Sequence, residues 1–153
     1  MIVRLKLLPI AVAVLIGLGS HSANAQTGAS PPGQMVDVNG VRIHYQERGS
    51  GEPLLLLHGF GACGNDWDGI AGILAQDFRV IIPDLRGHGW STNPTNHFTM
   101  RKSSEDIAAL LDHLGLARVK AMGISAGGMN LLHLATRQPD RSEALVLIGA
   151  TTH

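Results

Sequence analysis

The sequence predicts an α/β fold of three layers, with helices on both faces of a mostly parallel sheet that begins with an antiparallel hairpin. Two observations support this prediction. Four short apolar runs have the length and continuity of strands buried on both faces: residues 54–57, 78–82, 119–122 and 144–148. Stretches of helical periodicity separate these runs, and strands that alternate with helices are typical of a parallel sheet.

The hairpin is expected at the start of the fold. Residues 35–38 and 41–45 alternate in polarity around Asn39-Gly40. Such a pair is the strongest short-range signal for a two-residue hairpin turn. We therefore expect two antiparallel strands here, followed by turn residues at Gly49-Ser50-Gly51.

Three helices are expected between the later strands. The first covers residues 67–74, and the second carries an apolar stripe over residues 100–114. Thr99 is expected to cap the start of the second helix, and Gly115 to stop it. The third helix begins at Ser125 and runs to residue 138, because the proline that follows does not continue a helix.

The first 25 residues are expected to be a secretory signal peptide rather than part of the fold. Arg4 and Lys6 precede an apolar run over residues 7–18, and Ala23-Asn24-Ala25 has the small residues of a cleavage site. Cleavage between Ala25 and Gln26 predicts a secreted or periplasmic protein without stable membrane insertion. The alternative is an uncleaved anchor, although a spanning helix needs a longer apolar run. Residues 26–33 would form a flexible linker and residues 34–153 the domain.

Charge and composition exclude several classes of partner. The chain has 12 basic and 12 acidic residues, a formal net charge of 0, and no clustered run of charge. We therefore expect no nucleic-acid partner. The sequence has no metal, nucleotide or flavin motif, so we expect no cofactor and no metal site. Cys63 is the only cysteine, so no internal disulfide can form.

Ser125 is the candidate nucleophile. It lies in Gly123-Ile124-Ser125-Ala126-Gly127, where the strand at 119–122 meets the third helix. A serine hydroxyl attacks a carbonyl when a sharp turn presents it and a neighbouring base takes its proton. Gly123 and Gly127 allow the strand and the helix to approach closely around that turn.

The segment His58-Gly59-Phe60-Gly61 directly follows the apolar run at 54–57. A loop in this position donates one backbone N–H of an oxyanion hole, and the residue after the nucleophile donates the other. We therefore expect the amides of Phe60 and Ala126 to be the two donors. His58 and Gly59 are expected to support the loop.

These two motifs and the segment over residues 83–91, Pro-Asp-Leu-Arg-Gly-His-Gly-Trp-Ser, occur in order. With them, the chain resembles the esterase-like serine hydrolases of the α/β-hydrolase fold superfamily, over about residues 35–150. The resemblance implies a small-molecule ester-like substrate and hydrolysis through an acyl-enzyme on Ser125. It also implies a structural role for Asp84, Arg86 and His88, which would hydrogen-bond among themselves and to nearby backbone.

Other functions stay open beside ester hydrolysis. Cofactor-free haloperoxidases and C–C bond hydrolases of this fold can use the same serine. Dehalogenases and epoxide hydrolases of the fold carry an aspartate where Ser125 stands, which disfavours them. A further alternative is a catalytically inactive fragment or a non-catalytic, ligand-binding member of the fold.

No residue of the chain is a credible triad acid or histidine. In the family these follow the nucleophile, whereas Asp84 and His88 precede it. Other candidates are excluded by their expected places on helices, at the opposite sheet edge or at the last position: Asp112, His113, His133, Asp140, Glu143 and His153. We therefore expect the N-terminal portion of the fold, with about six of eight strands, no cap and an exposed sheet edge.

Three large apolar side chains could line a pocket: Trp67, Phe98 and Met129. For each of them we expect packing in the core or on the surface instead.

Overall fold

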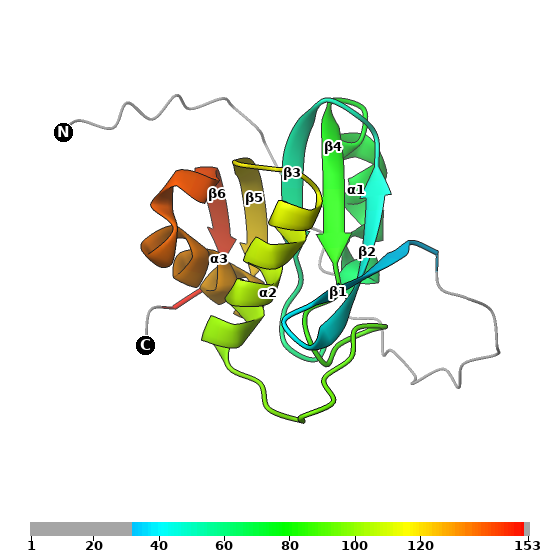
Figure 1. The fold of residues 1–153 in the computed structure, drawn as a ribbon. Helices are drawn as coiled ribbons and strands as arrows, with labels where there is room; N and C mark the ends of the chain where they lie inside the picture. The colour runs from blue at the N-terminus through cyan, green and yellow to red at the C-terminus, as the bar shows by residue number, and fades with distance from the viewer. Residues whose placement is uncertain (1–31, 152–153) are drawn as a thin grey trace. The chain divides into compact units, whose positions relative to one another are not determined.

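The computed structural model describes residues 32–151. The predicted signal peptide, its cleavage site and His153 lie outside the described residues, so export stays a prediction. The described residues form one sheet in the order β1-β2-β4-β3-β5-β6 (Figure 1). Its strands are β1 (Gln34–Val38), β2 (Val41–Arg48), β3 (Glu52–Leu57), β4 (Phe78–Pro83), β5 (Val119–Ile124) and β6 (Ser142–Ile148).

Three helices and two short 3₁₀ turns connect these strands. They are η1 (Gly64–Trp67), α1 (Asp68–Leu74), α2 (Met100–His113), α3 (Ala126–Arg137) and η2 (Pro139–Arg141). Strands β3, β4, β5 and β6 pair in parallel, whereas β2 pairs antiparallel with both β1 and β4. The predicted fold class is therefore confirmed.

The hairpin of β1 and β2 turns at the predicted dipeptide. Asn39 and Gly40 have φ angles of 48° and 75°, and Val38 lies opposite Val41. Two positive φ angles define the turn type whose twist matches that of the flanking strands. β2 extends three residues beyond the predicted end at Tyr45, because residues 46–48 pair with β4. Their polar side chains gave no strand signal.

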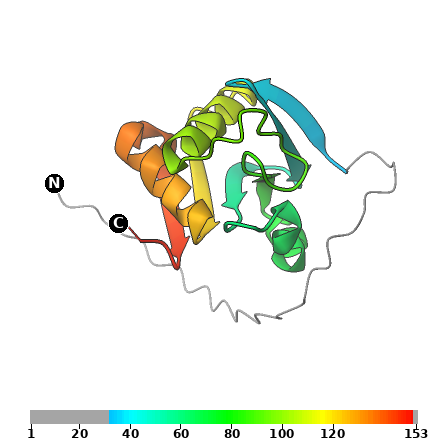
Figure 2. The same cartoon turned by 90° about the horizontal axis from the view of Figure 1, so that it is seen from below.

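The continuous apolar runs are explained by burial on both faces of the sheet. In β3, Leu55 and Leu57 pack toward α2 and α3, whereas Leu54 and Leu56 pack toward α1. Figure 2 shows the same layers, with α2 and α3 on one face of the sheet and α1 on the other. Each fully buried leucine contributes about 1.5–3 kcal/mol.

Both ends of α2 follow the sequence prediction. The Thr99 hydroxyl accepts a hydrogen bond from the Lys102 N–H at 3.1 Å, which caps the first turn. At the other end, Gly115 has a φ of +68°, the left-handed conformation that commonly follows a helix. The length of α2 is therefore set by local chemistry as well as by packing.

β6 forms one edge of the sheet, and its outer side pairs with no strand among residues 32–151. Val146 is 49% exposed, and Leu147 and Ile148 are also exposed. An apolar edge strand of this kind is open to pairing with another chain. Within the same residues, no helix combines the length and the apolar character needed to cross a membrane.

Candidate active site

Ser125 lies in the sharp turn between β5 and α3, as predicted. Its backbone has φ 50° and ψ −115°, angles that non-glycine residues rarely adopt. Its N–H donates to the Ile148 carbonyl of β6 at 2.8 Å, and its carbonyl accepts from the Met129 N–H of α3 at 3.0 Å. The surrounding strand and helix therefore hold the strained turn in place, and Ser125 is exposed.

The two flanking glycines permit a backbone approach that no side chain would allow. A Cβ on Gly127 would lie 2.2 Å from the Leu57 carbonyl oxygen, and one on Gly123 would lie 2.6 Å from the Gly127 carbonyl carbon. The ends of β3 and β5 and the first turn of α3 therefore lie so close together that their backbones are in contact. This is the close approach that the sequence predicted.

The loop after β3 passes directly beside Ser125. A Cβ on Gly59 would lie 3.6 Å from the Ser125 Cβ. The Gly59 carbonyl accepts from the Ala62 N–H at 3.3 Å, which closes a turn around Phe60. Ala126 is the first residue of α3, and a helix leaves the N–H groups of its first turn without partners along the helix. Gly59, the residue before Phe60, and Ala126 thus both adjoin Ser125.

The His58 side chain links this loop to the loop after β4. Its Nε2 accepts from the Leu85 N–H at 2.9 Å, so its Nδ1 carries the proton and donates to the Gly59 carbonyl at 2.7 Å. The ring is buried, and this burial lowers the pKa of His58 below 6.5. A neutral imidazole with both nitrogens engaged is not available to take a proton from Ser125.

Asp84 joins three parts of the site. It accepts from His44 Nδ1 at 2.8 Å, from the Gly64 N–H at 2.7 Å and from the Trp90 N–H at 2.9 Å. Burial raises the pKa of Asp84, but these three donors outweigh it and hold the pKa below 3.8. The other ring nitrogen of His44 faces the Pro32 carbonyl at 3.0 Å. Two acceptors around one ring favour the imidazolium form, and the pKa of His44 is raised although burial opposes it.

Arg86 makes a second buried ion pair with α2. Its Nε and Nη2 donate to the two carboxylate oxygens of Asp106 at 2.6 and 2.8 Å, and both side chains are buried. Asn39 of the hairpin turn also donates to Asp106, at 3.2 Å. A bidentate pair of this geometry fixes orientation as well as distance. Side chains of β2 and α2 therefore fix the loop after β4 through these buried ion pairs.

The predicted bonds to nearby backbone are present, since Asp84 accepts from the Trp90 N–H and Arg86 donates to the His97 carbonyl. Those predicted among Asp84, Arg86 and His88 are largely wrong. Only one contact links two of these residues, from the His88 ring to the Arg86 backbone carbonyl at 3.0 Å. The main partners are His44 and Asp106, which the sequence reasoning missed. Of the two, Asp106 carried a signal, because it lies beside Ile107 on the buried face of a helix, whereas His44 occupies a polar position of an alternating strand.

Glu143 and His133 lie away from Ser125, as predicted. β5 and β6 run parallel, with Val119 opposite Ser142 and Ile124 opposite Ile148. Glu143 is five residues before Ile148, or about 16 Å along the strand. His133 is eight residues along α3 from Ser125, or about 12 Å. Within residues 32–151, no hydrogen bond joins the Ser125 hydroxyl to a histidine.

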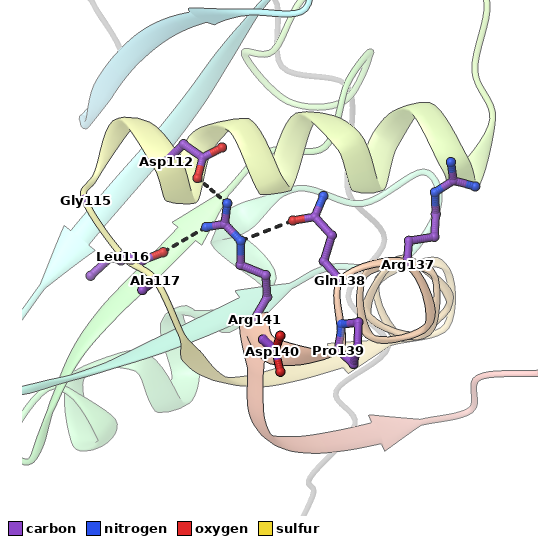
Figure 3. A pocket seen from close by; sticks show the side chains of 9 residues that line it. All are labelled: Asp112, Gly115, Leu116, Ala117, Arg137, Gln138, Pro139, Asp140 and Arg141. Atoms are coloured by element: carbon purple, nitrogen blue, oxygen red, sulfur yellow. Dashed lines mark hydrogen bonds and ion pairs between the residues drawn. The ribbon is translucent and has the colours of Figure 1, made fainter.

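Asp112 and Asp140 lie at a separate pocket of about 550 Å³, at the far ends of α2 and α3. Arg141 occupies its centre and bonds to Gln138, to the Leu116 carbonyl and to Asp112 (Figure 3). None of the nine lining residues is a serine, cysteine or histidine. This pocket therefore has no nucleophile, and Arg141 connects the ends of the two helices.

A groove of about 660 Å³ lies beside the loop after β3 and is lined by Phe60, His88 and Phe98 among others. Phe98 lines this groove and also packs against the rings of Phe60 and His88, so the expected packing is present at a groove position. Trp67 is buried in the core beneath α1, so packing is confirmed there. Among the described residues, no group of three or more His, Cys, Asp or Glu side chains could hold a metal ion.

Comparisons with known proteins agree with the fold. A family model described as "alpha/beta hydrolase fold" matches residues 52–153. The soluble epoxide hydrolase of Corynebacterium sp. (strain C12) is 39% identical over 111 residues, which cover 72% of this chain and 39% of that protein. The non-heme haloperoxidase of Rhodococcus erythropolis is 38% identical over 114 residues, covering 73% of this chain and 42% of that protein.

Among solved structures, a thermophilic esterase from Thermogutta terrifontis superposes with a TM-score of 0.74 at 33% identity. The match covers 78% of this chain and 47% of the esterase. The chain thus spans less than half the length of each of these three relatives.

Proposed function

Because the chain belongs to the α/β-hydrolase fold family, we propose that it carries the nucleophile and the oxyanion hole of a carboxylic ester hydrolase. One observation carries the proposal: Ser125 has a strained backbone with φ 50° and lies exposed between the loop after β3 and the first turn of α3. Such strain persists only where the surrounding structure enforces it, and it is concentrated at functional sites.

The proposed reaction follows from the arrangement. The Ser125 hydroxyl oxygen attacks the ester carbonyl carbon, and the carbonyl oxygen becomes an oxyanion. The amides of Phe60 and Ala126 donate to that oxyanion, and the start of α3 adds a favourable dipole. The alcohol then leaves, and water hydrolyses the acyl-serine to release the acid. A base takes the serine proton and passes it to the departing alcohol. That base is neither His44 nor His58, because their ring nitrogens are all engaged.

Similarity to an epoxide hydrolase does not transfer that activity to this chain. A carboxylate that opens an epoxide forms an ester, which water can cleave to regenerate the enzyme. A serine that opens an epoxide would form an ether, which resists hydrolysis and would block further turnover. The serine at position 125 therefore favours a carbonyl substrate.

Haloperoxidase activity is the second candidate, supported by the 38% identity to the Rhodococcus protein. The same Ser125 would serve both activities. Assaying halogenation with peroxide and bromide beside ester hydrolysis distinguishes them. Halogenation without ester hydrolysis would favour the second candidate.

The proposal is tested with p-nitrophenyl acetate and the 153-residue chain. Because no histidine among residues 32–151 hydrogen-bonds to the Ser125 hydroxyl, we expect slow release of p-nitrophenol together with acetylation of Ser125, both of which Ser125→Ala abolishes. Ser50→Ala, in an exposed turn, is the matched control and should behave like the parent chain. Equal release by the parent chain and Ser125→Ala would overturn the proposal and favour a non-catalytic role.

A further inference from the structure

Three aromatic rings form one wall of the groove beside the loop after β3. The centroids of Phe60 and His88 are 5.0 Å apart, those of Phe60 and Phe98 5.6 Å, and those of His88 and Phe98 5.7 Å. The interplanar angles of 78°, 78° and 68° describe edge-to-face contacts. This is a favoured geometry of aromatic pairs, so the three rings hold one another in fixed orientations.

Phe60 is the most open of the three rings. It is 69% exposed, the largest exposed fraction among the large apolar side chains of residues 32–151. Its chain neighbour Gly59 lies against Ser125, so the groove begins one residue from the loop position that adjoins the nucleophile. An exposed phenylalanine fixed by two other rings presents a ready apolar surface to a bound molecule.

The rest of the groove is polar and built from small residues. Asn93, Asn96, Gly87 and Gly89 contribute to its lining. The Asn96 N–H donates to the Asn93 carbonyl at 2.9 Å, which closes the turn between them. The volume of about 660 Å³ lies within the range of small-ligand sites. An aromatic wall with amide groups nearby suits a flat ring that carries a polar substituent.

We propose that this groove binds an aromatic ring of the substrate, so that aryl esters are the preferred substrate class. The substrate assignment rests on the proposed ester hydrolysis at Ser125. The binding of a ring rests only on the groove, and this allows the two claims to be tested separately. In the bound state the ring of the substrate packs against Phe60 and Phe98. Its polar substituent lies toward the side-chain amides of Asn93 and Asn96.

The test compares phenol with cyclohexanol, which has a similar size and the same hydroxyl but no aromatic ring. Binding to the 153-residue chain is measured by NMR titration. Aromatic contacts contribute about 0.5–1.5 kcal/mol per pair, so phenol should bind about threefold to tenfold more tightly. Phe60→Leu and Phe98→Leu should each remove most of this preference and leave cyclohexanol binding unchanged.

Two controls separate the possible outcomes. Phe78, the third phenylalanine of the chain, packs with Ala75 and Met122 on the face of the sheet that α1 covers. Phe78→Leu should therefore keep the preference for phenol. Ser125→Ala should also keep it while abolishing ester hydrolysis. Equal affinity for the two alcohols, or a preference that survives both Phe60→Leu and Phe98→Leu, would overturn the inference. Retained phenol preference without hydrolysis would instead contradict only the proposed function.

Discussion

His44 and Asp84 form a buried ion pair, with His44 Nδ1 2.8 Å from Asp84 Oδ2 and each side chain 3% exposed. The pair connects the middle of β2 to the loop after β4. Through its second oxygen, Asp84 also holds Gly64, at the end of the loop that carries Phe60. The position of the candidate oxyanion hole therefore depends on a pair of charges.

The contribution of this pair to stability should depend on pH. His44 has a raised pKa, so its contribution is complete below pH 6.5 and is lost as pH rises through the folded-state pKa. Asp84 has a lowered pKa, so its contribution is complete above pH 3.8 and is lost as pH falls further.

The measurement compares the free energy of urea unfolding of the parent chain and His44→Gln across this pH range. The difference between them should be largest between about pH 4 and 6.5 and shrink above it. His97→Gln, at an exposed position, is the control. A difference that grows as pH rises to about 9 would contradict the ion pair.

Substituting alanine for glycine should have opposite effects at two positions. Gly127→Ala places a Cβ 2.2 Å from the Leu57 carbonyl, so it should destabilise the fold by about 3 kcal/mol or more. Gly72→Ala lies in α1 with no atom within 4 Å of the new Cβ. It should stabilise the helix by about 0.5–1 kcal/mol. Urea unfolding measures both, and a similar stability of the two variants would contradict the backbone contact at the turn.

Two aspartates of α2 provide a matched comparison of ion pairs. Asp106→Ala leaves the buried Arg86 guanidinium without its carboxylate and should cost about 3–5 kcal/mol. Asp112 pairs with Arg141, but its side chain is 62% exposed. Asp112→Ala should therefore lower the free energy of unfolding by less than about 1 kcal/mol. The midpoint temperatures of thermal unfolding of the two variants should therefore differ widely. Equal losses would show that burial of the Arg86 pair is not the deciding factor.

The strain at Ser125 should be measurable as stability. Ser125→Gly relieves the cost of a positive φ and should stabilise the fold by about 1 kcal/mol. Ser125→Ala keeps a Cβ and should gain little. Both variants should lose ester hydrolysis. If Ser125→Gly unfolds at a lower urea concentration than Ser125→Ala, the turn is not strained.

The sequence was sufficient to predict the elements whose signals are local. The turn at Asn39-Gly40, the cap at Thr99 and the stop at Gly115 depend on residues a few positions apart. The sharp turn at Ser125 was also predictable, because its glycines and serine lie within five residues. The end of β2 was missed because its pairing with β4 involves residues more than thirty positions away.

The supports of the candidate site were harder to predict for the same reason. Asp84 pairs with His44, which is 40 residues away in the sequence, and Arg86 pairs with Asp106, which is 20 residues away. No local pattern specifies which buried charge meets which. The aromatic groove has a similar origin, because Phe60 and Phe98 come together only when β3 and β4 pair.

The most direct test of the central claim is mass spectrometry of the 153-residue chain after reaction with a fluorophosphonate. Reagents of this class phosphonylate serines that an oxyanion hole assists. A single adduct is expected on the peptide that contains Ser125, absent from Ser125→Ala and formed more slowly when Gly59→Val crowds the adjacent loop. An adduct on another serine, or equal labelling of Ser125 in native and urea-unfolded chain, would contradict the central claim.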